Sequence, residues 1–207
     1  MADGVALAWQ GSLLAGGEPS VDRTFAGVRR EELAGGAWLE HAPGWLSGAD
    51  AVFSLLLATV PWAQHERRMY DGKVAEPRLR ARWTLGPDGE EVPSVVDEMG
   101  AALGERYARR FDSVGLNLYR NGRDSVAWHG DRIPAEIAEP IVALVSVGEP
   151  RRLLLRPKGG GPSRRYLFGP GDLLVMGGTC QRTWEHTIPK VAGAGPRISL
   201  AFRHGLQ

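Results

Sequence analysis

The amino-acid sequence predicts an α+β fold that is mainly β: a double-stranded β-helix, or jelly roll, with supporting N-terminal helices. After Phe111 the apolar residues recur with a period of two, in short segments bounded by turn residues such as Asn121-Gly122. Eight short strands at this spacing are typical of a two-sheet roll or barrel. The expected strands are Val114–Tyr119, Val126–Asp131, Ile141–Val147, Arg152–Leu155, Arg165–Phe168, Leu173–Met176, Glu185–Ile188 and Arg197–Arg203.

Two helices are expected before these strands, over Ala49–Val60 and over Val95–Arg110. In each segment the apolar residues recur at intervals of three and four, which places them on one helical face. Ser94, with Asp97 three residues later, suits the N-cap of the second helix.

The length of 207 residues allows one well-buried domain. We expect residues 1–48 to form short strands and loops, an N-terminal extension packed on the core, and residues 49–207 to form a single domain. No apolar stretch approaches the ~20 residues that cross a bilayer, and the N-terminus does not resemble a secretory leader. Cys180 is the one cysteine, so an intrachain disulfide is excluded. A monomer in the cytoplasm, without a membrane partner, is therefore expected.

The net charge of +1 says nothing about nucleic acid, but the charges are unevenly distributed. The stretch from Arg151 to Arg165 holds six Lys or Arg residues and no acid, and Glu66 to Arg82 holds six basic residues against three acidic ones. Either run alone is also explained as a solvated face.

A candidate metal site begins with His129-Gly130-Asp131. On a strand the imidazole and the carboxylate, two residues apart, point to the same face, as joint coordination of one metal requires. His186 offers a third ligand. Two histidines and one carboxylate on one side of an ion leave positions open, the arrangement of non-haem iron(II) oxygenases. Alone, a His-x-Asp motif such as His129 and Asp131 is more often a surface pair or a satisfied half-buried histidine than a metal site.

The last expected strand places Arg197, Ser199, Ala201 and Arg203 on one face and three apolar residues on the other. Two arginines on an interior face are costly unless an anion lies between them, and a carboxylate is their natural partner. An outward-facing strand with solvated arginines remains the alternative. In the same way Asn117 and Tyr119 share a face, opposite Leu116 and Leu118, and could bond a carboxylate oxygen.

Five separated elements carry a family resemblance: Asn117-Leu-Tyr-Arg-Asn-Gly122, Trp128-His-Gly-Asp131, Pro170-Gly-Asp172, His186-Thr-Ile-Pro189 and the segment Arg197–Arg203. In this order they resemble the AlkB family of Fe(II)- and 2-oxoglutarate-dependent dioxygenases, which are oxidative dealkylases of nucleic acids. The resemblance covers residues 62 to 205.

The resemblance implies that His129, Asp131 and His186 bind Fe(II). Arg197, with Asn117 and Tyr119, would bind the far carboxylate of the co-substrate 2-oxoglutarate. Arg203 would hold its other carboxylate or orient Asp131. The implied reaction uses O2 and 2-oxoglutarate to oxidise an N-methyl group on a base, releasing formaldehyde, succinate and CO2; the metal carries the oxidation and the protein positions the reactants.

The implied partner is alkylated nucleic acid, with DNA preferred and RNA possible, carrying bases such as 1-methyladenine or 3-methylcytosine that must be flipped out of the stack. Residues of about 62–92 resemble the nucleotide-recognition lid of the family. In it Tyr70 and Trp83 would stack on bases and Arg78 would contact phosphate, or the two rings would simply pack. Arg164 and Arg165 would follow the nucleic-acid backbone.

One feature departs from the family pattern. Several repair members carry further acids directly after the metal aspartate, whereas here Asp131 is followed by Arg132, Ile133 and Pro134. Glu136 or Glu185 are candidates for the missing contact to the base, and Trp184 would either wall the base pocket or fill core.

Three alternatives remain open from the sequence. The first is an oxygenase of the same family that modifies RNA, particularly tRNA. The second is a catalytically silent jelly-roll binding module. The third is a zinc hydrolase with the same ligands, which would leave the two arginines of the last strand without a role.

Overall fold

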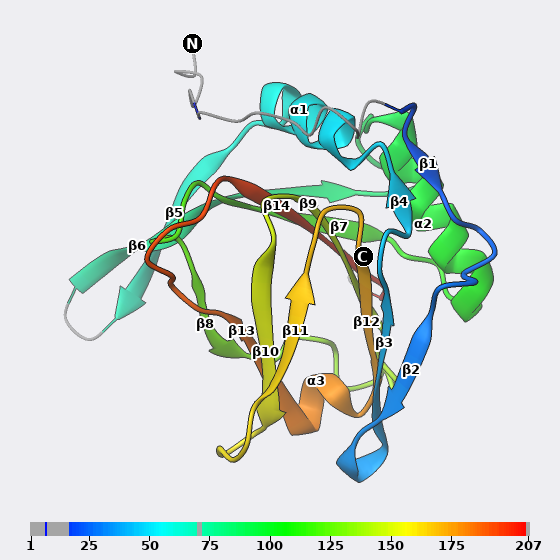
Figure 1. Cartoon of the computed structure of the whole chain (residues 1–207). Coiled ribbons are helices and arrows are strands. Elements are labelled where there is room, and N and C mark those ends of the chain that lie inside the picture. The colour runs from blue at the N-terminus through cyan, green and yellow to red at the C-terminus, as the bar shows by residue number, and fades with distance from the viewer. Residues whose placement is uncertain (1–6, 8–16, 70–71, 206–207) are drawn as a thin grey trace.

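Two antiparallel sheets face each other in this chain (Figure 1). The computed structural model describes residues 7, 17–69 and 72–205. The smaller sheet contains β8 (Val126–His129), β10 (Arg151–Pro157), β11 (Arg164–Phe168) and β13 (Trp184–Ile188). The larger sheet contains β2 (Arg29–Glu32), β3 (Ala37–Ala42), β5 (Ala63–Met69), β6 (Gly72–Thr84), β7 (Ser113–Tyr119), β9 (Val142–Gly148), β12 (Leu173–Gly178) and β14 (Arg197–Arg203).

The order of the strands brings distant parts of the sequence together. In the smaller sheet the order is β11, β10, β13, β8, and in the larger sheet it is β2, β3, β12, β9, β14, β7, β6, β5. A separate short pair joins β1 (Ser20–Val21) to β4 (Leu46–Ser47). The jelly-roll prediction is confirmed, and each of the eight strands expected after Phe111 is present with ends shifted by a few residues at most.

Helices α1 (Ala49–Thr59) and α2 (Ser94–Tyr107) cover the face of the larger sheet that points away from the smaller one (Figure 1). Both expected helices are therefore present, but the N-cap prediction was wrong. Pro93 is the N-cap, and its carbonyl accepts the backbone N–H of Val96 at 2.8 Å. At the other end Ala108 adopts a left-handed φ of 49°, which stops the helix before Arg110. Two short helical segments complete the fold, η1 (Ala34–Gly36) and α3 (Cys180–Thr183).

Alternation along the central strands divides the interior into two cores. In β14 the side chains of Ile198, Leu200 and Phe202 join the core under the helices, whereas Ala201 joins the core between the two sheets. Because successive side chains of a strand point to opposite faces, Arg197 and Arg203 also face the space between the sheets. The period of two in the sequence thus places polar side chains inside the roll.

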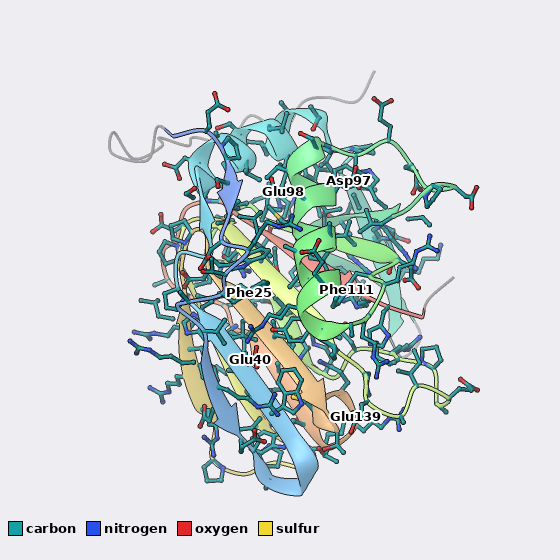
Figure 2. All side chains as sticks on the ribbon, turned by 90° about the vertical axis from the view of Figure 1, so that its right-hand side faces the viewer. Phe25, Glu40, Asp97, Glu98, Phe111 and Glu139 are labelled. Carbon is teal, nitrogen blue, oxygen red and sulfur yellow. The ribbon has the colours of Figure 1, made fainter. Side chains whose placement is uncertain are left out.

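A polar contact attaches the C-terminal end of α2 to the larger sheet. The carboxylate of Glu40, on β3, accepts the Tyr107 hydroxyl at 2.6 Å and Arg106 Nη2 at 3.2 Å. Figure 2 shows Glu40 on its strand near this end of the helix. Glu40 is buried, and these two donors together with Arg30 compensate its charge.

One part of the larger sheet was not expected as strands, whereas short strands were expected before residue 48. The hairpin of β5 and β6 extends the edge of the sheet within the segment likened to a lid, and the alternation in its sequence is weak because both faces of β6 up to Ala75 are exposed. At the opposite edge β3 pairs with β12 over six residues. Residues before position 48 therefore supply strands of the main sheet, and the domain boundary at 48 stays a prediction. No helix in the described part of the chain is long and apolar enough to cross a membrane.

Candidate active site

The two candidate histidines come from adjacent strands of the smaller sheet. His129 ends β8 and is the register partner of His186 on β13, which places both side chains on the same face. Their ring centroids lie 4.3 Å apart. Residues 57 positions apart in the sequence thus meet because their strands pair directly.

Asp131 joins them through a tight turn after β8. Gly130 has no space for a side chain, because a Cβ there would lie 2.5 Å from the carbonyl oxygen of Gln181. The same glutamine accepts the backbone N–H of Asp131 through its side-chain Oε1 at 2.8 Å. Gln181 is buried, with 3% of its surface exposed, so this contact holds Asp131 in place near the two histidines.

The carboxylate of Asp131 has two unlike oxygens. Oδ1 accepts Arg203 Nη2 at 2.6 Å and Nε at 3.2 Å, whereas Oδ2 is buried without a hydrogen-bond partner among the described residues. Burial raises the pKa of this carboxyl, but the charge of Arg203 and the two nearby imidazoles outweigh burial and hold the pKa below its usual value. Asp131 is therefore ionised, with one oxygen held and the other open.

The protonation of the histidines suits a metal. Burial, together with the neighbouring His129, lowers the pKa of His186 to about 3, so its imidazole is neutral at physiological pH. His129 Nδ1 donates to the backbone carbonyl of Ala127 at 2.8 Å, which leaves the lone pair on Nε2.

These donors fit Fe(II), which takes neutral imidazole nitrogens and carboxylate oxygens. The buried, unpartnered Oδ2 of Asp131 is the observation that carries this fit, because such an atom is costly unless something binds it. The side chains do not form a ready-made cage: in the segments that the structure describes, no group of three His, Cys, Asp or Glu has the spacing of a formed metal site.

Arg197 lies deeper in the roll and is almost fully buried, with 1% of its surface exposed. Its Nε donates to Ser146 Oγ at 2.8 Å, and its guanidinium carbon lies 5.3 Å from the ring centroid of Tyr119 and 5.1 Å from that of Phe168. Nη1 is buried with no partner among the described residues. Burial lowers the pKa of Arg197 to about 10, which still leaves it charged at physiological pH. A buried cation with an unused N–H fits a carboxylate ligand.

Asn117 faces the same interior as Tyr119, and an arginine of the neighbouring strand fixes the orientation of its amide. Arg78 Nε, from β6, donates to Asn117 Oδ1 at 2.9 Å. Because this bond uses the amide oxygen, the NH2 group is the end left to donate to a carboxylate. The side chain of Arg78 is only 12% exposed and also pairs with Glu76 at 3.0 Å.

Of the five residues expected to contact nucleic acid, two do not present the expected surface. Trp83 is buried at 8% exposure in the core under the helices, which favours the packing alternative over stacking on a base. Arg78 is engaged by Asn117 and Glu76 rather than offered to a phosphate. Both residues lie on β6, whose inner half packs against β7. Tyr70 lies outside the described residues.

The remaining two are on the surface. Arg164 is exposed, pairs with Glu31 and lies with its guanidinium carbon 5.8 Å from the ring centroid of Trp184. Arg165 is exposed on the outer face of the smaller sheet. Trp184 itself is buried and donates through Nε1 to the carbonyl of Ala34 at 3.1 Å, so it fills core.

The two acids proposed for base contact lie in different settings. Glu185, beside His186, pairs with Arg156 Nε at 2.6 Å, and that guanidinium lies 4.0 Å from the ring centroid of Trp128. Glu136 is exposed in the loop after β8. The charge of Glu185 is therefore neutralised by Arg156, whereas the side chain of Glu136 is exposed to solvent.

The positioning roles of Gln181 and Ser146 were not identified from the sequence. Each makes a single bond that positions a candidate site residue, Gln181 for Asp131 and Ser146 for Arg197. The available signal for Ser146 was that it is the single polar residue in the otherwise apolar expected strand Ile141–Val147. Gln181 had none, because its role depends on α3 meeting the turn at Gly130.

Comparisons with known proteins identify the family of this chain. The model of the 2OG-Fe(II) oxygenase superfamily matches residues 40–203. The chain is 34% identical to alpha-ketoglutarate-dependent dioxygenase alkB homolog 3 of Bos taurus over 183 residues, covering 78% of this chain and 64% of that protein. It is 36% identical to the DNA oxidative demethylase ALKBH2 of Arabidopsis thaliana, covering 73% of this chain and 60% of that protein.

A solved structure of OsALKBH1 superposes with a TM-score of 0.58 at 15% identity, covering 85% of this chain and all of that one, which supports the fold. The chain spans less than two thirds of the length of the curated relatives named above. The superfamily takes its name from Fe(II) and 2-oxoglutarate, with O2 as the oxidant. By the match to its family model and by homology to the two AlkB relatives, the chain belongs to the 2OG-Fe(II) oxygenase superfamily.

Proposed function

We propose that this chain is an oxidative demethylase that repairs N-alkylated bases, such as 1-methyladenine and 3-methylcytosine, in DNA. The observation that carries the proposal is the meeting of His129 and His186, 4.3 Å apart, beside an ionised Asp131 with one open oxygen. The named activity of the Arabidopsis relative, DNA oxidative demethylation, supports DNA as the substrate.

In this proposal the metal ligands are His129, Asp131 and His186. When bound, Fe(II) with O2 and 2-oxoglutarate supplies the oxidation of the N-methyl group, from which formaldehyde leaves, with succinate and CO2 as co-products. The chain holds the reactants in place. Arg203 keeps Asp131 ionised and oriented, because its guanidinium lies 2.6 Å from Oδ1.

The co-substrate site lies deeper between the sheets. Arg197 offers the unused Nη1 to the far carboxylate, and the NH2 group of Asn117 and the hydroxyl of Tyr119 complete the site. Phe168 and Tyr119 flank the guanidinium and exclude water from it, which strengthens its attraction for an anion.

The nucleic acid would lie over the exposed basic residues near the hairpin of β10 and β11, where Arg165 contacts the backbone. The cytoplasm and a monomeric state belong to the same proposal.

A mass measurement tests the proposal. The full chain is incubated with Fe(II), 2-oxoglutarate and oligonucleotides that carry 3-methylcytosine, in matched DNA and RNA forms. We expect the DNA to lose the methyl group and succinate to form in equal amount. Faster loss of the methyl group from RNA than from DNA would show that the chain modifies RNA. If 2-oxoglutarate is not consumed with either oligonucleotide, the chain is a catalytically silent binding module.

A further inference from the structure

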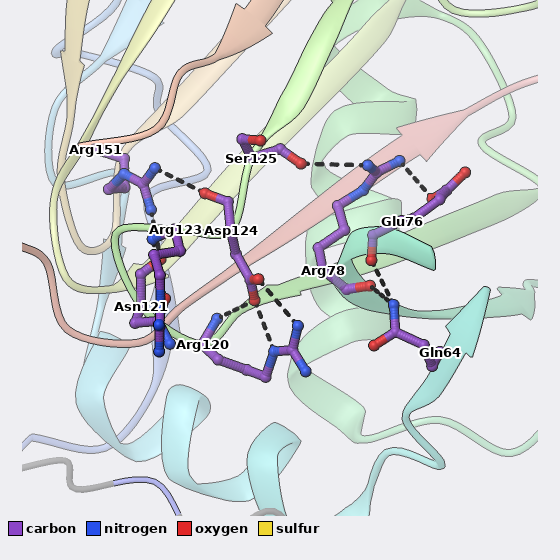
Figure 3. Close-up of polar contacts among 9 residues, drawn as sticks. All are labelled: Gln64, Glu76, Arg78, Arg120, Asn121, Arg123, Asp124, Ser125 and Arg151. Atoms are coloured by element: carbon purple, nitrogen blue, oxygen red, sulfur yellow. Dashed lines mark hydrogen bonds and ion pairs between the residues drawn. The ribbon is translucent and has the colours of Figure 1, made fainter. Parts of the chain in front are cut away.

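A second arginine, Arg151, is buried beside the candidate co-substrate site. It begins β10, has 2% of its surface exposed, and makes no ion pair with a carboxylate in the part of the chain that the structure describes. Its guanidinium instead bonds three backbone carbonyls: Asn121 at 3.3 Å, Asp124 at 3.0 Å and Pro189 at 2.6 Å. The nearest carboxylate, of Asp124, is taken by Arg120 in two bonds of 2.8 and 3.0 Å (Figure 3).

The three carbonyls belong to two loops that lead to the candidate site. Asn121 and Asp124 lie between β7, which ends at Tyr119, and β8, which ends at His129. Pro189 follows β13, which carries His186. Figure 3 shows Arg151 reaching the first of these loops, which Arg78 contacts from the other side through Ser125. The side chain of Arg151 thus holds the loop between β7 and β8 and the loop that follows β13, which are the strands that carry Tyr119, His129 and His186.

Arg151 and Arg197 both place a guanidinium group near the ring of Tyr119. The guanidinium carbon of Arg151 lies 5.7 Å from the ring centroid of Tyr119, and that of Arg197 lies 5.3 Å from the same ring. Each guanidinium keeps a buried nitrogen without a partner among the described residues, Nε in Arg151 and Nη1 in Arg197. Two buried cations at one aromatic ring repel each other, and each lacks an anionic partner, so the arrangement is costly by itself. A carboxylate bound between Tyr119 and Arg197 would offset the cost of both.

We propose that Arg151 is a positioning residue of the 2-oxoglutarate site, which fixes Tyr119 and the loop after it and adds a second positive charge behind the far carboxylate. This inference rests on the proposed function. It predicts that Arg151 contributes to the binding of dicarboxylates and has little effect on a 2-oxo acid that lacks the second carboxylate.

The test compares the wild-type chain with Arg151→Met, Arg151→Lys and the control Arg152→Met. Arg152 is the next residue on β10 and points outward to solvent, so its loss removes the same charge from the opposite face. Binding of 2-oxoglutarate, succinate and pyruvate to the full, Mn(II)-loaded chain is measured by calorimetry, with thermal unfolding of each variant as the folding control.

We expect Arg151→Met to raise the Kd for 2-oxoglutarate and succinate about tenfold, because the far carboxylate loses a nearby positive charge and Tyr119 loses its fixed position. The Kd for pyruvate should change less than about twofold. Arg151→Lys keeps the charge and should recover part of the affinity. Arg152→Met should bind all three as the wild type does. In turnover, the KM for 2-oxoglutarate should rise while kcat at saturation stays close to the wild-type value.

A double-mutant cycle separates positioning from a general loss of packing. Because Arg151 fixes the ring of Tyr119, the effects of Arg151→Met and Tyr119→Leu on the Kd for 2-oxoglutarate should be less than additive; fully additive effects would overturn the proposal. An Arg151→Met chain that folds and binds 2-oxoglutarate with the wild-type Kd would overturn it as well. If Arg151→Met does not fold, the comparison of Arg151→Lys with Arg151→Gln decides, because only the lysine retains the charge. A wild-type chain that binds no 2-oxoglutarate overturns the proposed function together with this inference.

Discussion

The guanidinium of Arg203 bonds one oxygen of Asp131 at 2.6 and 3.2 Å, and this contact joins β14 of the larger sheet to the end of β8 in the smaller one. The other oxygen stays buried and open. Arg203 therefore acts on the candidate metal site through its ligand, and it does so without occupying the side of the carboxylate that a metal would use.

Arg203→Met should weaken Mn(II) binding about tenfold, because the carboxylate loses the contact that orients it. It should also move the pH at which half the metal is bound upward. Arg203 lowers the pKa of Asp131, so its removal raises that pKa and protonates the ligand at a higher pH. Titration of Mn(II) by electron paramagnetic resonance across the acidic range measures both effects. Arg132→Met, which removes an exposed charge from the next residue, is the control, and an unchanged midpoint in Arg203→Met would contradict this role.

Arg78→Met should raise the Kd for 2-oxoglutarate by about fivefold, the value of one ordinary hydrogen bond, because the amide of Asn117 can then rotate. The matched control is Arg80→Met, which removes an exposed arginine two residues along β6. Equal Kd values for 2-oxoglutarate in the two variants would show that Arg78 does not orient the amide.

Trp83→Ala should lower the free energy of unfolding by roughly 3–5 kcal/mol, since it removes a large side chain from the core under the helices. Its effect on the affinity of the folded chain for a methylated oligonucleotide should be within about twofold, less than a lost base-stacking contact would cause. Urea unfolding and a binding titration measure the two quantities. A stable variant with much weaker oligonucleotide binding would restore the stacking role that the structure argues against.

His204 predicts a loss of stability in mild acid. Its Nε2 accepts the backbone N–H of Ile141 at 3.0 Å, and burial lowers its pKa. As the pH falls from about 7 to 5, the unfolded chain takes up a proton on this histidine near its ordinary pKa of ~6.5 while the folded chain resists, so the free energy of unfolding falls by at most about 1.4 kcal/mol per pH unit. In His204→Gln the amide oxygen can still accept the N–H of Ile141, but the side chain no longer titrates in this pH range.

Urea unfolding at each pH should therefore show a smaller decline for His204→Gln than for the wild type. His65→Gln, which replaces an exposed histidine, serves as the control and should decline as the wild type does. Parallel curves for all three chains would show that His204 is not the group responsible.

The second half of the fold was predictable because one physical rule governs it. Strands with one face in each core alternate strictly, so Leu116 and Leu118 point to the helices while Asn117 and Tyr119 point inward. The same alternation gave the inward face of Arg197 and Arg203. The hairpin of β5 and β6 was not predictable in this way, because where both faces of a strand are exposed no alternation is required.

The contacts that position the candidate site were the least predictable part. Arg78 looks like a phosphate ligand in the sequence, since it stands among other arginines, and only the pairing of β6 with β7 brings it to Asn117. Trp83 looks like a stacking residue in the sequence, but its side chain joins the core under the helices. Arg151 lies in a basic run, yet alternation along β10 turns it inward and leaves Arg152 outside.

The central claim is that His129, Asp131 and His186 bind one metal within reach of a diacid held by Arg197. Anomalous diffraction from crystals grown with Mn(II) and 2-oxoglutarate tests it most directly. We expect one strong peak bonded to both imidazoles and to Asp131 Oδ2, with the far carboxylate of 2-oxoglutarate on Arg197. A peak bound elsewhere, or one that His186 does not touch, would contradict it.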